Sequence, residues 1–366
     1  MRKRPTARSH YILVIFAFTL VLSSCAFPAP ELSTSAPAMP VTATFPSTDW
    51  LQITFTDPTG PHAHDYEGGP DKALAASIDQ ARLSVDMAAY SLNLWSIRDA
   101  LIHAYQRGVV VRMVMESDNM DVQEVQQILD SGIPIVGDQH EGLMHDKFVV
   151  VDRSVVWTGS MNYTVGGTYK DNNNLLSIRS NQIADYYTQE FEEMFTHRLF
   201  GPDRISNIPN LKKVNINGIP MEIYFSPEDR PAARIVELIK GARESINFMA
   251  YTFTSNEIGT AILERAKAGV SVLGVFDGGQ VASGQGTEYD PLQQAGLDVR
   301  LDGNQTGLMH HKVIIIDKSI VITGSYNFTA SAEENNDENV LIIFNSEVAA
   351  KYLDEFQRVN DQAEQP

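Results

Sequence analysis

Apolar positions along the chain alternate between two spacings, and the whole alternation occurs twice. Spacings of three and four residues are typical of one face of a helix, and they occur at 74–81, 97–105, 122–129 and 183–195, then at 235–239, 258–266 and 348–356. Short apolar runs typical of buried strands lie between them, at 85–92, 109–115 and 175–178, then at 246–253, 270–276 and 340–344. This alternation predicts an α/β sheet covered by helices in each half.

The two halves repeat one unit. The strand that ends at Tyr90 corresponds to the strand that ends at Tyr251, and the helix stop at Gly108 corresponds to the stop at Gly269. Glycines and prolines interrupt the periodic segments between 201 and 220. Because the repeat is longer than a solenoid unit of 20–50 residues, we interpret it as a duplicated domain. The predicted domains are 49–205 and 213–360.

The first 24 residues have the layout of a secretory signal peptide. Four basic residues precede an apolar run at 11–22, which is short for a membrane span. The tetrad Leu22-Ser23-Ser24-Cys25 resembles the bacterial lipobox, which implies that Cys25 is acylated and becomes the first mature residue. The alternative is an ordinary signal peptide cleaved near Ala26 or Ala29. Cys25 is the only cysteine, so the chain forms no internal disulfide.

Residues 25–48 are rich in Pro, Ser, Thr and Ala, and their one charged residue is Glu31. A segment of this composition does not bury a core, so it is predicted to be a tether. The N-terminal region therefore predicts an exported, membrane-anchored lipoprotein on the cell surface or the periplasmic side.

The charge of the chain is strongly acidic. The formal net charge is −18, and because residues 1–24 contain four basic and no acidic residues, the remainder carries −22. Nucleic-acid binding depends largely on Lys and Arg that meet phosphates, and the sequence contains no long Lys/Arg cluster. The charge therefore disfavours a nucleic-acid partner, although acidity also simply aids solubility.

One stretch occurs in both halves with its polar positions at identical spacing. Residues 142–162 are GLMHDKFVVVDRSVVWTGSMN, and residues 307–327 are GLMHHKVIIIDKSIVITGSYN. The repeated positions are His145, Lys147, Asp152, Gly159, Ser160 and Asn162 in the first half, and His310, Lys312, Asp317, Gly324, Ser325 and Asn327 in the second. Core packing does not explain six chemically distinct positions, so the stretch predicts an active site.

Each residue type in the stretch suits phosphoryl chemistry. A neutral imidazole is a nucleophile and a protonated one is a general acid. Lysines hold negative oxygens as point charges, while Asn and Ser side chains donate hydrogen bonds. If the halves meet face to face, the two copies surround one phosphoryl group and stabilise its charge without a metal. Asp152 and Asp317 fall at the turn of a predicted hairpin, where Asp is common, so we interpret them as structural.

The doubled pattern of HxK, then Asp, then GSxN resembles the phospholipase D superfamily, the HKD phosphodiesterases, and the resemblance covers about 49–359. It implies two α/β/α domains related by a pseudo-two-fold, with one active site at their interface. It also implies a two-step displacement through a phosphohistidine, with no cofactor or metal. By this resemblance His145 and His310 do the covalent and acid–base chemistry. Lys147, Lys312, Asn162 and Asn327 bind phosphoryl oxygens, and Ser160 and Ser325 lie beside them at the substrate.

One departure distinguishes the halves. The residue 28 positions after His145 is Asn173, and the residue 28 positions after His310 is Glu338. In the family a carboxylate there orients its histidine, so we expect Glu338 to favour an imidazolium on His310 and Asn173 to accept from His145. This predicts His145 as the nucleophile and His310 as the general acid. The competing interpretation is that Asn173 marks a weakened first half.

The remaining histidines and tyrosines of interest are assigned no catalytic or metal-binding role. His62 and His64 lie in a stretch that the second half lacks, and we expect a polar surface loop there rather than a metal site. His311 replaces Asp146 at the variable motif position and is expected to tune the site. Tyr90 and Tyr251 suit the cleft wall and the buried core equally well.

The leading hypothesis is a membrane-tethered phosphodiesterase that cleaves a phospholipid headgroup. The second keeps the chemistry but takes DNA or RNA as substrate, and the third is a binding module without catalysis. The intact His, Lys and Asn in both copies disfavour the third. Because one chain holds both half-sites, a monomer suffices.

Overall fold

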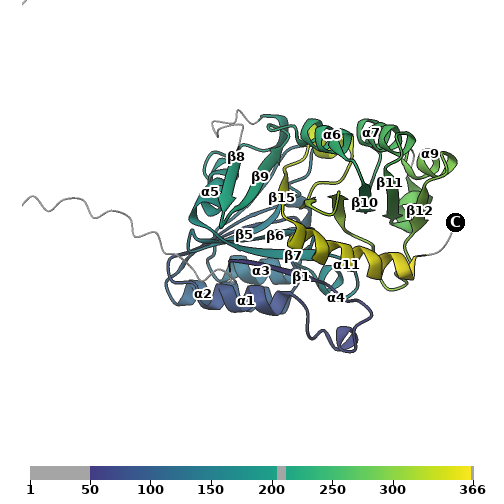
Figure 1. Ribbon diagram of the computed structural model, residues 1–366. Coiled ribbons are helices and arrows are strands. Elements are labelled where there is room, and N and C mark those ends of the chain that lie inside the picture. The colour runs from purple at the N-terminus through teal and green to yellow at the C-terminus, as the bar shows by residue number, and fades with distance from the viewer. Residues whose placement is uncertain (1–49, 204–211, 285, 364–366) are drawn as a thin grey trace, which may run out of the picture. The chain divides into compact units, whose positions relative to one another are not determined.

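The computed structural model describes residues 50–203, 212–284 and 286–363, and its strands form two sheets (Figure 1). The first sheet takes its strands from residues 51–179 and the second from residues 212–344. The fold is therefore the mixed α/β fold that the sequence predicts, repeated twice. We call the two parts lobe 1 and lobe 2.

The sheet of lobe 1 has the strand order β1-β7-β6-β5-β2-β3-β4. Its strands β2, β3 and β4 are parallel, and the remaining neighbours are antiparallel. The strands are β1 (Leu51–Phe55), β2 (Ser84–Ala89), β3 (Val110–Met115), β4 (Ile135–Gly137), β5 (Lys147–Val151), β6 (Val155–Gly159) and β7 (Asn174–Arg179). The motif lysine of lobe 1, Lys147, is thus the first residue of the central strand β5.

The sheet of lobe 2 repeats this order and adds one strand. Its order is β12-β11-β10-β13-β14-β15-β9-β8, in which β8 lies outside the counterpart of β1. The strands are β8 (Lys212–Ile216), β9 (Ile219–Ser226), β10 (Ser245–Ala250), β11 (Ser271–Phe276), β12 (Asp298–Leu301), β13 (Lys312–Ile316), β14 (Ile320–Gly324) and β15 (Glu338–Phe344). The second motif occupies the same central position on β13.

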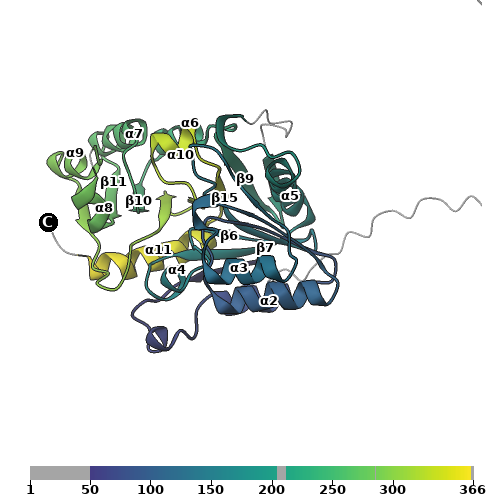
Figure 2. The same cartoon turned by 180° about the vertical axis from the view of Figure 1, so that it is seen from behind.

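Helices cover the outer faces of both sheets and fill the space between them (Figures 1 and 2). Lobe 1 contains α1 (Asp71–Asp79), α2 (Trp95–Gln106), α3 (Gln123–Asp130), α4 (Val165–Tyr169) and α5 (Asn181–Phe195). Lobe 2 contains α6 (Pro231–Gly241), α7 (Asn256–Lys267), α8 (Gly278–Ser283), α9 (Tyr289–Gln294), α10 (Ala330–Glu334) and α11 (Ser346–Gln362). Short 3-10 turns occur at Ala63–Asp65, Ser117–Asn119 and Gly201–Asp203.

Three apolar cores hold these layers together. One lies under α1, α2 and α3, and another lies under α6, α7 and α9. The third combines apolar side chains of α5 and α11 with the inner faces of both sheets. Because this third core belongs to both lobes, the lobes pack as one body around it.

The strands before the first long loops end earlier than the sequence predicts. Apolar residues continue to 92 and 253, but β2 ends at Ala89 and β10 ends at Ala250. The chain leaves the sheet at Tyr90 and Tyr251, whose rings turn toward the motif histidines. The extra apolar residues are buried in the outer cores instead of extending the strands.

The predicted signal peptide, Cys25 and the tether at 25–48 lie outside the described residues. Within the described part of the chain, no helix combines the length and the apolar character that a bilayer crossing requires.

Candidate active site

Each motif histidine is attached by backbone hydrogen bonds to the opposite lobe. The amide of His145 donates to the carbonyl of Asp337 at 3.0 Å, and the amide of Asp337 donates to the carbonyl of Leu143 at 2.9 Å. In the same way, the amide of His310 donates to the backbone carbonyl of Asn172 at 3.0 Å, and the backbone amide of Asn172 donates to the carbonyl of Leu308 at 2.8 Å. Such reciprocal contacts are what a pseudo-two-fold requires.

These cross-lobe ladders reverse the predicted pairing of the histidines. The Nδ1 of His145 donates to Glu338 Oε2 at 2.7 Å, and the Nδ1 of His310 donates to Asn173 Oδ1 at 2.9 Å. The expectation that each histidine meets the residue 28 positions further on is therefore wrong. The physical reason is the ladder, which aligns each histidine with the downstream segment of the other lobe.

Ser160 and Ser325, which the resemblance places beside the substrate, form hydrogen bonds with the buried residues that contact the histidines. Ser160 is fully buried, and its hydroxyl donates to Asn173 Oδ1 at 2.8 Å. Ser325 accepts from the amide of Asn339 at 3.0 Å, and its hydrogen bond lowers the pKa of Glu338. The serine hydroxyls form hydrogen bonds with buried residues of their own lobe, so they position the groups that contact the histidines.

Glu338 is fully buried in this arrangement. Burial raises its pKa to about 7, although the charge of Lys147 and hydrogen bonds from Ser325 and Asn336 act in the opposite direction. A carboxyl whose pKa lies near neutrality readily exchanges a proton with the imidazole beside it. Glu338 is thus suited to hold the His145 ring in one tautomer, with Nε2 free to react.

The two motif lysines are buried as completely as the apolar core. Lys147 is 0% exposed and Lys312 is 1% exposed. Each Nζ donates to the backbone carbonyl of its own histidine, at 2.7 Å for His145 and 2.9 Å for His310. Burial lowers the pKa of Lys147 to about 7 and also lowers that of Lys312 well below its usual value.

Two tyrosines line the same site from equivalent positions. The Lys147 ammonium lies 5.0 Å from the ring centre of Tyr90, and the Lys312 ammonium lies 4.7 Å from that of Tyr251. The same rings pack against His145 and His310, with centroid distances of 4.8 Å and 4.6 Å. Each tyrosine face therefore stabilises a lysine charge and supports a histidine ring.

The charges of both motif lysines act on both motif histidines. Burial lowers the pKa of both His145 and His310 well below the usual value, and the charges of Lys147 and Lys312 lower both further. Each histidine therefore lies within electrostatic range of both lysines, in agreement with the backbone hydrogen bonds that join each motif to the opposite lobe. An anionic group that binds there would cancel the lysine charges and raise the pKa of both histidines.

The motif asparagines have the same unusual feature in both lobes. The Oδ1 of Asn162 and the Oδ1 of Asn327 are buried without a hydrogen-bond partner among the described residues. A buried amide oxygen without a partner is costly, so this repeated feature is typical of a site built for a ligand. Each of these oxygens is a hydrogen-bond acceptor, so it suits a protonated group of a ligand, whereas a phosphoryl oxygen would bind the amide nitrogen of the same side chain.

The motif aspartates lie at the other end of the central hairpins. The Asp152 carboxylate accepts from the amides of Arg82, Leu83 and Ser84 at 2.7–3.1 Å. Asp317 accepts from Arg243, Glu244 and Ser245 at 2.7–3.1 Å. These bonds attach each hairpin turn to the start of the neighbouring strand. Each aspartate follows the last residue of a five-residue strand that begins with the motif lysine.

The motif glycines permit a close approach of strands. Gly159 and Gly324 have φ angles of 150° and 143°, which side chains rarely adopt. A Cβ at either position would overlap a backbone carbonyl oxygen, that of Asn174 or that of Asn339. Glycine thus lets the strand with the histidine partner pack directly against the motif.

Two carboxylates that the sequence analysis did not identify accept hydrogen bonds from the backbone just before the motif histidines. Glu116 accepts from the amide of Met144 at 3.0 Å, and Asp277 accepts from the amide of Met309 at 3.0 Å. Each follows directly on a predicted apolar strand, at equivalent positions of the repeat. That equivalence was the signal that could have identified them.

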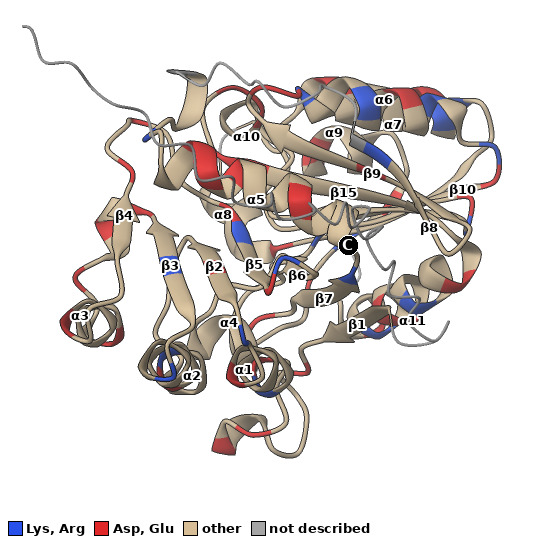
Figure 3. Cartoon of the chain, turned by 90° about the vertical axis from the view of Figure 1, so that its left-hand side faces the viewer, with Lys and Arg blue, Asp and Glu red and all other residues tan. Residues whose placement is uncertain are grey.

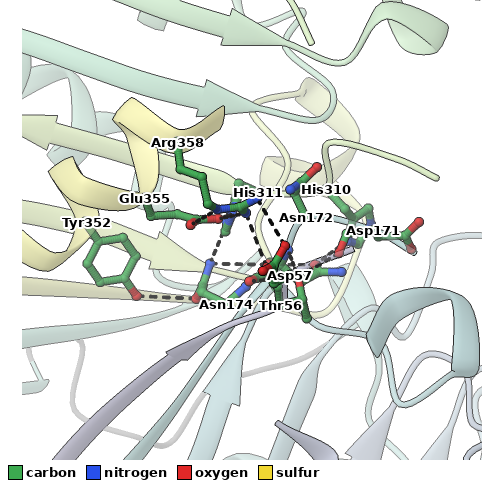
Figure 4. A network of polar contacts seen from close by, with 12 residues as sticks. Thr56, Asp57, Asp171, Asn172, Asn174, His310, His311, Tyr352, Glu355 and Arg358 are labelled. Carbon is green, nitrogen blue, oxygen red and sulfur yellow. Dashed lines mark hydrogen bonds and ion pairs between the residues drawn. The ribbon is translucent and has the colours of Figure 1, made fainter. Parts of the chain in front are cut away.

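His311 belongs to a buried network at the lobe boundary (Figure 4). Its Nε2 donates to Glu355 Oε1 at 2.9 Å, and its Nδ1 accepts from Asn174 Nδ2 at 3.2 Å. Arg358 pairs with the same Glu355 and donates to the carbonyl of Thr56 in lobe 1 at 3.3 Å. His311, at the variable motif position, therefore connects α11 to lobe 1 through hydrogen bonds to both.

Potential metal ligands lie apart from the motif histidines. Within the described part of the chain, carboxylates of Glu190, Glu193 and Glu228 come within 4.8 Å of one another, a spacing suited to a metal ion. None of the motif residues belongs to this group, and all three carboxylates have interaction partners. His62 and His64 are exposed, and the group does not include them.

Comparison with known proteins identifies a family and a fold. The family described as "Cardiolipin synthase, PLD-like domain" matches residues 74–195 and again residues 235–360. A phospholipase D of Rickettsia typhi is 37% identical over 147 residues, which are 40% of this chain and 69% of that protein. The mouse mitochondrial cardiolipin hydrolase is 37% identical over 143 residues, and the match spans 63% of its length.

A solved structure shows a similar fold over most of the chain. The phosphatidylserine synthase of Haemophilus influenzae has a TM-score of 0.65, with 87% of this chain and 88% of that chain covered. Its sequence identity is 13%, so this likeness concerns the fold alone.

Proposed function

Because the chain belongs to the phospholipase D superfamily of phosphodiesterases and carries its PLD-like domain twice, we propose that it hydrolyses the headgroup ester of a phospholipid. The observation that supports this most strongly is that the two motifs meet across the lobe boundary, where the charges of both motif lysines act on both motif histidines. Both lysines are buried, and burial lowers the pKa of each, so a bound anion would stabilise their charged forms. A phosphodiester, which carries one negative charge, satisfies such a site.

In the first step, Nε2 of His145 attacks phosphorus and the bond from phosphorus to the headgroup oxygen breaks. His310 donates its Nε2 proton to the departing alkoxide, which leaves as an alcohol. The Glu338 carboxylate accepts a hydrogen bond from Nδ1 of His145 and so stabilises the positive charge that develops on the ring. The assignment of His145 as nucleophile thus stands on a new argument, since the predicted pairing is wrong.

In the second step, His310 takes a proton from water and the water oxygen attacks phosphorus. The bond between phosphorus and Nε2 of His145 breaks, which releases phosphatidic acid and restores both histidines. His310 suits this exchange because its partner is the neutral amide of Asn173, which adds no charge to hold the proton. Lys147 and Lys312, with the amides of Asn162 and Asn327, stabilise the phosphoryl oxygens in both steps.

Charge and kinship favour a lipid over a nucleic acid. Figure 3 shows Asp and Glu distributed along the chain, with Lys and Arg in isolated places. The formal charge of −18 repels a polyanion, whereas a zwitterionic headgroup carries no net charge. Two relatives are named for lipid hydrolysis, as a phospholipase D and a cardiolipin hydrolase.

The test is to assay phosphatidylcholine vesicles and plasmid DNA side by side, each with and without EDTA. We expect release of choline, intact DNA and the same rate with EDTA, because the mechanism uses no metal. Nicked DNA without lipid hydrolysis would assign the chain to the nucleases, and inactivity on both would favour a binding module. A rate that EDTA abolishes would contradict the metal-free mechanism.

We also propose that the chain is anchored to a membrane through an acylated Cys25. The support is the lipobox-like tetrad after an apolar run of suitable length, followed by the tether composition of 25–48. Radiolabelled palmitate should enter the wild-type chain and be absent from Cys25→Ser in the producing bacterium. Equal labelling of both chains would contradict the anchor.

A further inference from the structure

Two exposed leucines occupy equivalent positions next to the two motif histidines. Leu143 is 36% exposed and Leu308 is 37% exposed, and each lies two residues before its histidine. Most large apolar side chains in the described residues are buried, so exposure of the same side chain in both copies is distinctive. A structural role in one lobe would not explain why both lobes keep it.

The backbone directs these leucines to the same side as the histidines. The segment from Leu143 to His145 is extended, because it forms a parallel bridge with the opposite lobe at Met144. In extended chain, residues two apart point to one side and the residue between them points to the other. Met144 is fully buried in the shared core, so Leu143 and His145 both point away from that core.

The second lobe repeats this geometry. Met309 forms the parallel bridge with Asn172 and is fully buried in the same shared core. Leu308 therefore points to the same side as His310. The two leucines flank the approach to the two histidines from opposite lobes.

Both leucines are held in place by the hydrogen bonds of the site itself. The carbonyl of Leu143 accepts from Asp337, and the carbonyl of Leu308 accepts from Asn172. In addition, the Leu143 amide donates to Asn336 Oδ1 at 3.2 Å, and the Leu308 amide donates to Asp171 Oδ1 at 2.9 Å. With all four backbone groups bonded, the backbone of both leucines is fixed, so docking orders no additional backbone.

We propose that Leu143 and Leu308 dock the mouth of the active site onto a zwitterionic phospholipid bilayer by entering its interfacial region. This inference rests on the proposed function, because the site must face the layer in which headgroup esters lie. A bilayer suits two separated apolar side chains, since it is continuous and needs no shaped pocket. The acidic charge of the chain selects a surface without net negative charge.

Site-specific fluorescence tests the docking directly. Because Cys25 is the only cysteine, full-length Cys25→Ser accepts a single label at a chosen position. An environment-sensitive fluorophore is placed on Leu143→Cys, on Leu308→Cys and, as a matched control, on Leu83→Cys. Leu83 is 68% exposed, but it adjoins Asp152 at the opposite end of the central hairpin.

With phosphatidylcholine vesicles, we expect a blue shift and quenching by spin-labelled lipid at positions 143 and 308, and neither at 83. Labels at 143 and 308 that stay in water, or three labels that respond alike, would overturn the docking. Hydrolysis of vesicles while both labels stay in water refutes the docking and leaves the proposed function intact. Labels that enter the bilayer without any hydrolysis support the docking and refute the proposed function.

Activity gives a second readout. In the double variant Leu143→Asp and Leu308→Asp, hydrolysis of phosphatidylcholine vesicles should fall about tenfold relative to Leu83→Asp, because a charge replaces apolar surface at the bilayer. Equal rates for the two chains would contradict a role of the leucines in docking.

Discussion

The two motif histidines lie in equivalent segments, but their Nδ1 atoms meet different acceptors. His145 donates to a carboxylate of Glu338 at 2.7 Å, whereas His310 donates to an amide of Asn173 at 2.9 Å. The surrounding lysines, tyrosines and motif asparagines are otherwise alike. The duplicated site thus gives its two histidines unlike hydrogen-bond acceptors, and we propose that this difference separates the nucleophile from the acid.

Replacing each histidine should produce the largest loss and also distinguish the two roles. We expect His145→Asn and His310→Asn each to lower kcat on phosphatidylcholine by about 10⁴-fold or more. A substrate with a p-nitrophenol leaving group needs no acid, so His310→Asn should still release one equivalent of nitrophenol in a burst. Stopped-flow absorbance measures the burst, and a burst from His145→Asn instead would reverse the roles.

The lysines should behave alike, because each lowers the pKa of both histidines. Lys147→Met and Lys312→Met should each lower kcat by about 10²–10³-fold through lost stabilisation of the phosphoryl charge. Removing one positive charge also raises the pKa of both histidines, so the pH–rate profile moves to higher pH. Steady-state kinetics over a pH series measures both effects, and an effect confined to one lysine would contradict a shared site.

Substituting the histidine partners tests whether the difference between Glu338 and Asn173 separates the roles of the two histidines. Glu338→Gln gives His145 an amide acceptor like that of His310, and kcat should fall about 10–100-fold because the developing charge loses its carboxylate. Asn173→Asp should raise the pKa of His310, which moves the alkaline limb of the pH–rate profile to higher pH. The control is Ser160→Ala, which keeps the amide but removes one of its hydrogen bonds. An unchanged alkaline limb in Asn173→Asp would show that His310 is not the acid.

The motif aspartates should affect stability alone. Asp152→Ala and Asp317→Ala remove a carboxylate that accepts three backbone amides, and each should cost about 1.5–3 kcal/mol of unfolding free energy. Urea denaturation measures this cost, and kcat of the folded chains should stay within about twofold of wild type. A large loss of kcat without a loss of stability would place these residues in the chemistry.

The pH dependence of Asp317 sharpens this prediction. Burial alone would raise its pKa, but the backbone donors outweigh burial and lower the pKa below the ordinary 3.8. A lowered folded-state pKa gives stability that is present above 3.8 and is lost as the pH falls through the folded value. Asp317→Asn should therefore flatten the decline of stability below pH 3.8, as measured by urea midpoints in acid.

The sequence predicted the repeat, the α/β fold and the motif residues because these follow from local patterns. Hydrophobic spacing identifies a buried strand such as β13 wherever the fold places it. The pairing of Glu338 with His145 is different, because it depends on backbone ladders between segments 193 residues apart. Counting along the chain shows which positions are equivalent, but it does not show which lobe they face.

Packing within each lobe accounts for other roles at the site that local patterns do not show. Ser160 and Ser325 look like ligand donors in the sequence, but their hydroxyls are committed to the buried partners of the histidines. Glu116 looks like an ordinary residue at the end of a strand, yet it holds the backbone before His145. These contacts lie within one lobe, but they join segments that only the folded lobe brings together.

Trapping the covalent intermediate tests the central claim most directly. The chain is mixed with a phosphodiester labelled at phosphorus, quenched within the first turnover and digested, and the labelled histidine is located by mass spectrometry. The asymmetry between Glu338 and Asn173 predicts the label on His145. Label on His310 would contradict the assignment of the two halves.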